Sequence, residues 1–172
     1  LRRVLVRLEG EGLLQSVHGV GTFVTDVEVE ELAQTYQLRL ELAELTGKLG
    51  AVAPDDALWQ EFRTLSARSK ALIGAPDPRR FAELNMDFFI ALLRLTTNEP
   101  LKEICERLYF HTTRIWLKSV FASRIDLVDE VDIFDREVHD ILRALEIGDL
   151  HAAALIQRAH ISMSFERMRR NG

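Results

Sequence analysis

The sequence has few of the features that mark secreted, disulfide-stabilised or membrane proteins. It contains one cysteine in 172 residues, so an intramolecular disulfide is excluded and a reducing compartment is expected. Its apolar runs are short and interrupted by charged residues, so none is long enough to span a bilayer. A positively charged start followed by an apolar stretch, which would indicate a secretion signal, is also missing. We therefore expect a cytoplasmic protein that has no membrane partner.

The composition and the distribution of charge fit a globular protein that carries a small basic element. Hydrophobic residues make up 47% of the chain and charged residues 28%, which is the balance of a folded domain with a buried core. The net charge of −5 is unevenly spread, because residues 1–25 contain three arginines against two glutamates and the remainder is acidic. A weakly basic head on an acidic body fits a small DNA-contacting element joined to a regulatory domain.

The start of the chain combines a helical pattern with a hairpin pattern. Leu1, Leu5 and Leu8 have helical spacing, and Gly12 is suited to ending a helix. The apolar and β-branched residues that follow flank residues 18–21, which predicts two short strands around a tight turn. A helix followed directly by such a hairpin is the second half of a winged helix, and it is too small to bury a core alone.

The rest of the chain is predicted to be helical. From residue 29 onward the apolar residues recur with a period near 3.6, and no strand pattern competes. Asp77 precedes Pro78 and is a predicted N-cap. The predicted helices span residues 31–53, 54–73, 78–96, 100–121, 126–148 and 149–170. Because short turns join helices of this length, we predict an all-α fold, a six-helix antiparallel bundle, preceded by a partial winged helix-turn-helix.

The first 24 residues resemble the winged helix of the GntR family from its recognition helix onward. The resemblance is carried by an arginine after an apolar residue, a leucine-rich stretch, an acidic-Gly-Leu end and a hairpin that closes in Gly-Thr-Phe-Val. These residues are Arg2, Leu5, Leu8, Glu11-Gly12-Leu13 and Gly21-Thr22-Phe23-Val24. The resemblance implies that residues 1–25 are the C-terminal part of a truncated DNA-binding domain that contains the recognition helix and the wing.

Residues 29–168 resemble the FadR-type effector domain, often called FCD. The matching stretches are Tyr36-Gln37-Leu38-Arg39, Leu84–Phe89, Asn98-Glu99-Pro100-Leu101, and His139 with Gly148-Asp149 and His160. Each motif alone is weak evidence for the resemblance, but the order and spacing of the motifs together match those of the FadR-type effector domain. The resemblance implies that residues 26–172 form a helical effector-binding and dimerisation domain.

The resemblance assigns DNA contacts to the start of the chain. It implies that Arg2 in the recognition helix touches DNA and that His18 and Gly19 of the wing reach the minor groove. Arg3 and Arg7 belong to the same predicted helix, and arginine there can bind phosphates or a guanine edge. The residues alone leave another interpretation open, namely surface arginines on an amphipathic helix beside an ordinary hairpin turn.

The resemblance also implies a metal site, from which this sequence departs. In many relatives an Asp, a His four residues later and two His from the last helices bind a divalent ion such as Zn or Ni. Here the four positions are Asn85, Phe89, His139 and His160. Phenylalanine cannot ligate, and Asp87 lies about 200° around the helix from Asn85. A metal would thus depend on His139 and His160, with Asn85 as a third ligand, at a weakened site.

The same positions predict a small-molecule pocket with an apolar lining. The candidate effector-binding residues are Arg39, Asn85, Phe89, His139 and His160. Arg39 is suited to pairing with an effector carboxylate because guanidinium binds it bidentately. Two other interpretations stay open, because a lone histidine beside an apolar stripe is usually a hydrogen-bonded core residue, and Arg39 is also placed to pair with Glu41 on the helix surface.

Together these features predict a ligand-responsive regulator of transcription, such as a repressor, rather than an enzyme. It would act as a homodimer on palindromic double-stranded operator DNA, with a small organic acid as effector. One alternative is a helical interaction domain whose pocket is vestigial. Another is a helical metal-dependent enzyme built on His139 and His160, although no general base is placed for it.

Overall fold

The computed structural model describes residues 5, 14–17, 21–24, 32–121 and 126–171. Two short strands, β1 (Leu14–Val17) and β2 (Gly21–Val24), pair antiparallel with Leu14 opposite Val24. Strands were expected in this stretch, but their assignment to a winged helix stays a prediction. The predicted DNA-contacting residues Arg2, Arg3, Arg7, His18 and Gly19 all lie outside the described residues.

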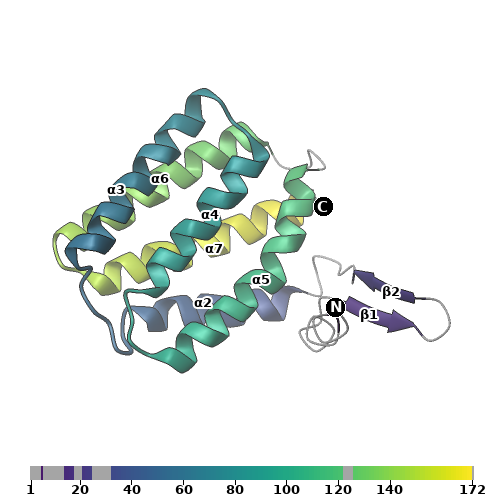
Figure 1. Cartoon of the computed structure of the whole chain (residues 1–172), viewed down its shortest axis with the longest axis horizontal. Coiled ribbons are helices and arrows are strands. Elements are labelled where there is room, and N and C mark those ends of the chain that lie inside the picture. Colours follow the sequence, from purple (N-terminus) through teal and green to yellow (C-terminus); the bar gives the residue numbers. More distant parts are fainter. Residues whose placement is uncertain (1–4, 6–13, 18–20, 25–31, 122–125, 172) are drawn as a thin grey trace.

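Six helices make up the body of the described chain, as the periodicity predicts. They are α2 (Ala33–Thr46), α3 (Asp56–Gly74), α4 (Pro78–Leu93), α5 (Glu99–Phe121), α6 (Leu127–Glu146) and α7 (Leu150–Asn171). Their main contacts run from α2 to α7, α6, α3, α4, α5 and back to α2, so the helices close a ring. Figure 1 shows α3, α4 and α6 grouped on one side, with α2 and α5 crossing on the other. The interior of this ring is where a ligand pocket can form.

Aspartate caps set the starts of three helices. The Asp55 carboxylate accepts from the Leu58 N–H at 2.7 Å, and the Asp77 carboxylate accepts from the Arg80 N–H at 2.8 Å. Asp126 caps α6 in the same way. Each cap satisfies backbone N–H groups that have no partner within the helix, which favours starting the helix at that residue. The predicted N-cap at Asp77 is therefore confirmed.

The first helix of the bundle is shorter than predicted. It ends at Thr46 rather than continuing to residue 53. After it, Gly50 adopts a positive φ of 63°, and its carbonyl accepts from the Thr97 N–H at 2.8 Å. The Val52 N–H then donates to the Leu95 carbonyl at 2.9 Å. The chain leaves the helix because these backbone groups pair with the α4–α5 connection, a long-range contact that helical periodicity does not reveal.

Aromatic rings fill the centre of the ring of helices. Phe88 of α4 lies between Phe62 of α3 and Phe134 of α6, with ring centroids 6.1 and 5.5 Å away. Phe81 packs against Phe134 and Trp116 at 5.5 and 5.4 Å. The edge-to-face geometry of most of these pairs adds to the stabilisation from burial. This cluster joins four helices and forms one wall of the pocket described below.

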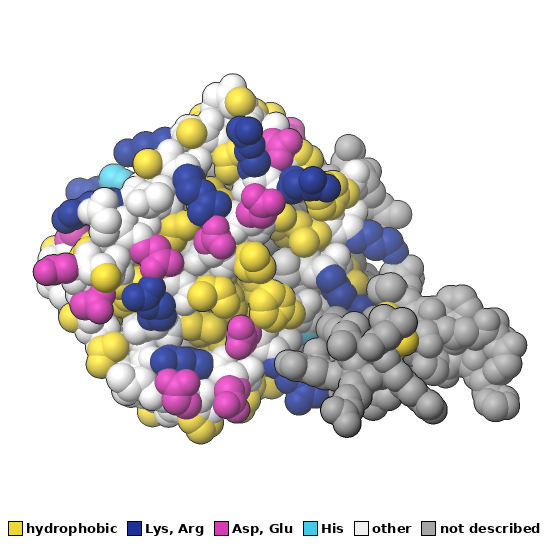
Figure 2. All heavy atoms as spheres, in the orientation of Figure 1, with side chains coloured by type: hydrophobic (Ala, Val, Ile, Leu, Met, Phe, Trp, Pro, Cys, Tyr) yellow, Lys and Arg dark blue, Asp and Glu magenta, His cyan; other side chains and the backbone are white. Residues whose placement is uncertain are grey.

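The surface mixes charged side chains of both signs with exposed apolar ones. Figure 2 shows this on the face drawn, where basic and acidic side chains surround a central group of apolar ones. Some charges pair between α3 and α4, as Arg68 with Asp87 at 2.7 Å and Arg94 with Glu61 at 2.5 Å. Such exposed pairs contribute little to stability. No helix in the described part of the chain is long and apolar enough to cross a membrane.

Candidate functional site

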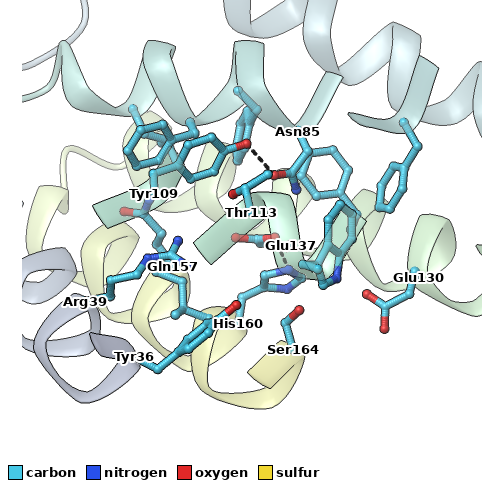
Figure 3. Close-up of a pocket in the computed structure, with 17 residues that line it drawn as sticks. Tyr36, Arg39, Asn85, Tyr109, Thr113, Glu130, Glu137, Gln157, His160 and Ser164 are labelled. Atoms are coloured by element: carbon cyan, nitrogen blue, oxygen red, sulfur yellow. Dashed lines mark hydrogen bonds and ion pairs between the residues drawn. The ribbon is translucent and has the colours of Figure 1, made fainter. Parts of the chain in front are cut away.

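A cavity of about 70 Å³ lies inside the ring of helices. Its lining comes from α2, α4, α5, α6 and α7 and combines an apolar wall with several polar groups that converge on it (Figure 3). Four of the five residues that the sequence predicts for effector binding line it. These are Arg39, Asn85, Phe89 and His160.

Arg39 brings a positive charge to the pocket from α2. Its guanidinium donates to the Thr112 hydroxyl at 2.6 Å and lies 5.2 Å from the ring centre of Tyr36 and 5.7 Å from that of Tyr109. No carboxylate of a described residue lies within 4 Å of it, and Glu41 pairs with Arg158 instead, at 3.2 Å. The surface salt bridge between Arg39 and Glu41 is therefore excluded. A cation held by aromatic faces, without an acidic partner, is suited to binding an anion.

Two other predicted residues form an aromatic and amide wall. The Phe89 ring stacks on the Tyr109 ring with centroids 3.9 Å apart and planes 5° apart. The Tyr109 hydroxyl donates to Asn85 Oδ1 at 2.9 Å, and burial raises the pKa of Tyr109 to about 12. Tyr109 thus stays protonated at neutral pH and orients the Asn85 amide. Among the described residues, no hydrogen bond engages the Asn85 N–H₂ group, and Asn85 lines the cavity.

The acidic group of the pocket is Glu137, which sequence reasoning missed. Its side chain is 7% exposed, and its Oε2 lies 2.9 Å from His160 Nε2 (Figure 3). The two atoms are close enough for an ion pair when His160 is protonated, and Oε2 has no hydrogen-bond partner among the described residues. A signal for this residue was present, because Glu130 and Glu137 share the helical face of Phe134 and Ile141.

His139, in contrast, does not belong to the site. It is exposed on the outer side of α6 and does not line the cavity. Two residues along a helix correspond to a rotation of about 200°, so an inward Glu137 places His139 outward. The predicted convergence of His139 with Asn85 and His160 is therefore wrong, and so is its interpretation as a core histidine. His160 is a partly buried pocket residue.

A second acid at the pocket, Glu130, is neutralised within the protein. Its side chain is 4% exposed, and both of its carboxylate oxygens contact the Arg167 guanidinium, Oε2 at 3.1 Å from Nη2. Sequence reasoning missed this pair because its members are 37 residues apart on α6 and α7. Trp116 is a further missed residue, and its buried Nε1 has no hydrogen-bond partner among the described residues. Glu137 is therefore the pocket carboxylate that has no arginine partner among the described residues.

The donors in the pocket do not fit the metal site that the resemblance implies. Among the described residues, no group of three His, Cys, Asp or Glu side chains is placed to hold an ion. Glu137 and His160 are two strong donors from two helices. Asn85 is a neutral third whose oxygen is already engaged by Tyr109. Transition metals in proteins are usually held by three or four imidazole, thiolate or carboxylate ligands, so this set of donors does not fit Zn or Ni.

A smaller cavity of about 20 Å³ adjoins the first and shares Arg39 and Phe89 with it. Its far wall contains Cys105, which is buried. Burial raises the pKa of the Cys105 thiol from an ordinary 9.0 to about 11, and the nearby charge of Arg39 opposes this only in part. The thiol is therefore protonated at neutral pH and is not a nucleophile.

This predicts slow alkylation of Cys105 in the folded protein. At pH 8, raising the pKa of the thiol from 9.0 to about 11 reduces the fraction present as thiolate roughly 100-fold. Burial of Cys105 also limits the access of the alkylating reagent. We expect iodoacetamide to modify the native chain at least about 100-fold more slowly than the chain unfolded in urea. Mass spectrometry of timed samples measures both rates. Equal rates would show that Cys105 is accessible and ordinarily acidic.

The fold and pocket can be compared with known proteins. The family model described as FCD domain matches residues 34–163. McbR/YncC of Escherichia coli has a TM-score of 0.87 and 17% identity, over 100% of this chain and 84% of that one. The Listeria monocytogenes protein Lar has a TM-score of 0.70 and 12% identity, over 99% and 79%. A GntR-family transcriptional regulator from Pseudomonas syringae has a TM-score of 0.62 and 18% identity, over 98% and 68%.

At these identities the solved structures establish the fold alone, and no match was found among curated proteins. The family model, however, covers three quarters of the residues and includes five of the six helices over their whole length or nearly so. The helices that form the ring and line its central pocket lie largely within the matched residues. This chain belongs to the FCD domain family.

Proposed function

We propose that this chain is the effector-binding part of a DNA-binding transcription regulator. In this proposal a small organic carboxylate binds in the central pocket and modulates binding to operator DNA. A solved structure with the same fold is a GntR-family transcriptional regulator, and residues 1–25 resemble the DNA-binding half of that family's winged helix. The regulator would be a homodimer, because two winged helices are needed to read a palindromic site. We place it in the cytoplasm, where its operator DNA would be.

The observation that carries the proposal is Arg39. It is a fixed cation on a pocket wall, without an acidic partner among the described residues, and it is held by Thr112 and two aromatic rings. The pocket around it is lined by residues of five helices, so a bound ligand can contact several helices of the ring at once. A ligand that contacts so many helices can change their packing, and the change can reach a DNA-binding element joined to α2.

Thermal unfolding with a panel of small carboxylic acids tests the pocket. A ligand that binds only the folded chain raises the melting temperature, and the rise grows with the ratio of ligand concentration to its dissociation constant. We expect at least one acid to raise it for the wild-type chain, and we expect Arg39→Met to abolish that rise while Arg39→Lys retains part of it. If no acid raises the melting temperature, the pocket is vestigial and the chain is better described as a helical interaction domain.

DNA binding requires its own test in the full-length regulator. We expect it to bind a short palindrome with an affinity that falls steeply as salt increases, because phosphate contacts release counterions. Binding that is indifferent to sequence would contradict the proposal. The alternative of a metal-dependent enzyme depended on His139 and His160 meeting in one site, which they do not do.

A further inference from the structure

The pocket contains two opposite charges that are left without strong partners in the described chain. Among the described residues, no carboxylate lies within 4 Å of Arg39 on α2, and no lysine or arginine lies within 4 Å of Glu137 on α6. The remaining pocket acid, Glu130, is already paired with Arg167. Figure 3 shows Arg39 on one side of the pocket and Glu137 farther in, beside His160. The pocket is therefore dipolar, with a cationic end and an anionic end.

We infer that the effector is a small amino-carboxylate, with its carboxylate on Arg39 and its ammonium group on Glu137. This inference rests on the proposed function, in which the effector is a small carboxylate, and it adds an amino group to that effector. A carboxylate can accept about four hydrogen bonds, and the Oε2 atom of Glu137 has no hydrogen-bond partner among the described residues, with only the His160 ring nitrogen beside it at 2.9 Å. A buried carboxylate without donors is costly unless a ligand supplies them, and an ammonium group supplies three together with a compensating charge.

The same anionic end disfavours effectors that carry a second carboxylate. A dicarboxylate or tricarboxylate would place a second negative charge near Glu137, where repulsion in a low-dielectric interior opposes binding. His160 beside Glu137 offsets part of this charge only when it is protonated. A hydroxy acid could donate one hydrogen bond to Glu137 but would leave its charge uncompensated. The arrangement therefore favours an amino group over a hydroxyl group at this position.

The size of the cavity limits the effector further. Its volume of about 70 Å³ is small, which favours a compact ligand. Compounds of two to four carbons that carry one carboxylate and one amino group are compact ligands of this kind. Phe81, Phe88 and Leu92 give the remaining wall an apolar surface that suits a short carbon chain.

Isothermal titration calorimetry with matched probes tests this inference. The probes are amino-carboxylates of two to four carbons with the amino group at carbon 2, 3 or 4, each with its hydroxyl and unsubstituted counterparts. Alanine, lactate and propionate are one such set, and succinate and malonate represent dicarboxylates. We expect one amino-carboxylate to bind at least about tenfold more tightly than its hydroxyl counterpart, and more tightly still than propionate or succinate.

Substitution of Glu137 separates its role from the general stability of the fold. In Glu137→Gln, which keeps the shape of the side chain, we expect the preference for the amino group over the hydroxyl group to fall to less than about twofold. Glu146→Gln, at an exposed position on the same helix, should leave the preference unchanged. Circular dichroism of each variant verifies that the helices remain folded.

The outcomes distinguish this inference from the proposed function on which it rests. If hydroxy or unsubstituted acids bind as tightly as their amino counterparts, the carboxylate pocket stands and the amino-carboxylate inference is overturned. The inference is likewise overturned if Glu137→Gln keeps the full preference for the amino group. If none of the probes binds the wild-type chain, both the inference and the proposed carboxylate pocket fail.

Discussion

Replacing Arg167 with leucine is expected to lower the free energy of unfolding by about 3–5 kcal/mol. Glu130, whose side chain is 4% exposed, would lose both contacts to the guanidinium and remain as an unpaired carboxylate in the interior. Removing one member of a buried ion pair is costly because the other loses its compensation while staying out of water. Urea unfolding followed by circular dichroism measures the change as a shift of the midpoint.

The two members of this pair are not equivalent, which provides a control. Arg167 is 27% exposed, so its head group can turn toward water when Glu130 is removed. We therefore expect Glu130→Leu to destabilise the chain less than Arg167→Leu does, and the double variant to be more stable than either single one. Equal losses in the two single variants, or a double variant with the summed loss, would contradict this account of the pair.

Structural features that depend only on residues within one helix could be predicted from the sequence. The N-cap at Asp77 was identified from an aspartate before a proline, because the cap needs only local residues. The six helices followed from an apolar period of 3.6, which local sequence also carries. The end of α2 could not be predicted in this way, since the chain turns at Gly50 to pair with residues of the α4–α5 connection.

The family resemblance indicated which helices line the pocket. Which side chains of α6 face the cavity depends on their position around the helix axis. Arg39, Asn85, Phe89 and His160 line the cavity as predicted. The motif on α6 drew attention to His139, although an inward-facing residue there must share the face of Phe134 and Ile141. Counting from Phe134 in steps of three and four reaches Glu137 and not His139. In α6, the acidic residue that stands where the helical pattern expects an apolar one, Glu137, therefore indicated the pocket better than the neighbouring His139.

Substitution of Phe88 by alanine is expected to cost about 3–5 kcal/mol of unfolding free energy. The ring is 2% exposed and lies between Phe62 and Phe134 in the aromatic cluster of the bundle. Its removal forfeits burial and two edge-to-face contacts and leaves a void that the surrounding helices cannot fill without shifting. Because Phe88 also lines the pocket, the void opens into the cavity and enlarges the space for a ligand.

The enlarged pocket makes the effect measurable in two ways. Urea unfolding should show the loss of stability, with Phe88→Leu intermediate and Phe121→Ala, at a 58% exposed ring, within about 0.5 kcal/mol of the wild type. Calorimetry should show a shift in ligand preference toward longer carbon chains, because the new space adjoins the apolar wall. A loss below about 1 kcal/mol for Phe88→Ala would mean that the aromatic cluster does not hold α3, α4 and α6 together. In that case the position of the pocket wall would be set by contacts between neighbouring helices away from the aromatic cluster.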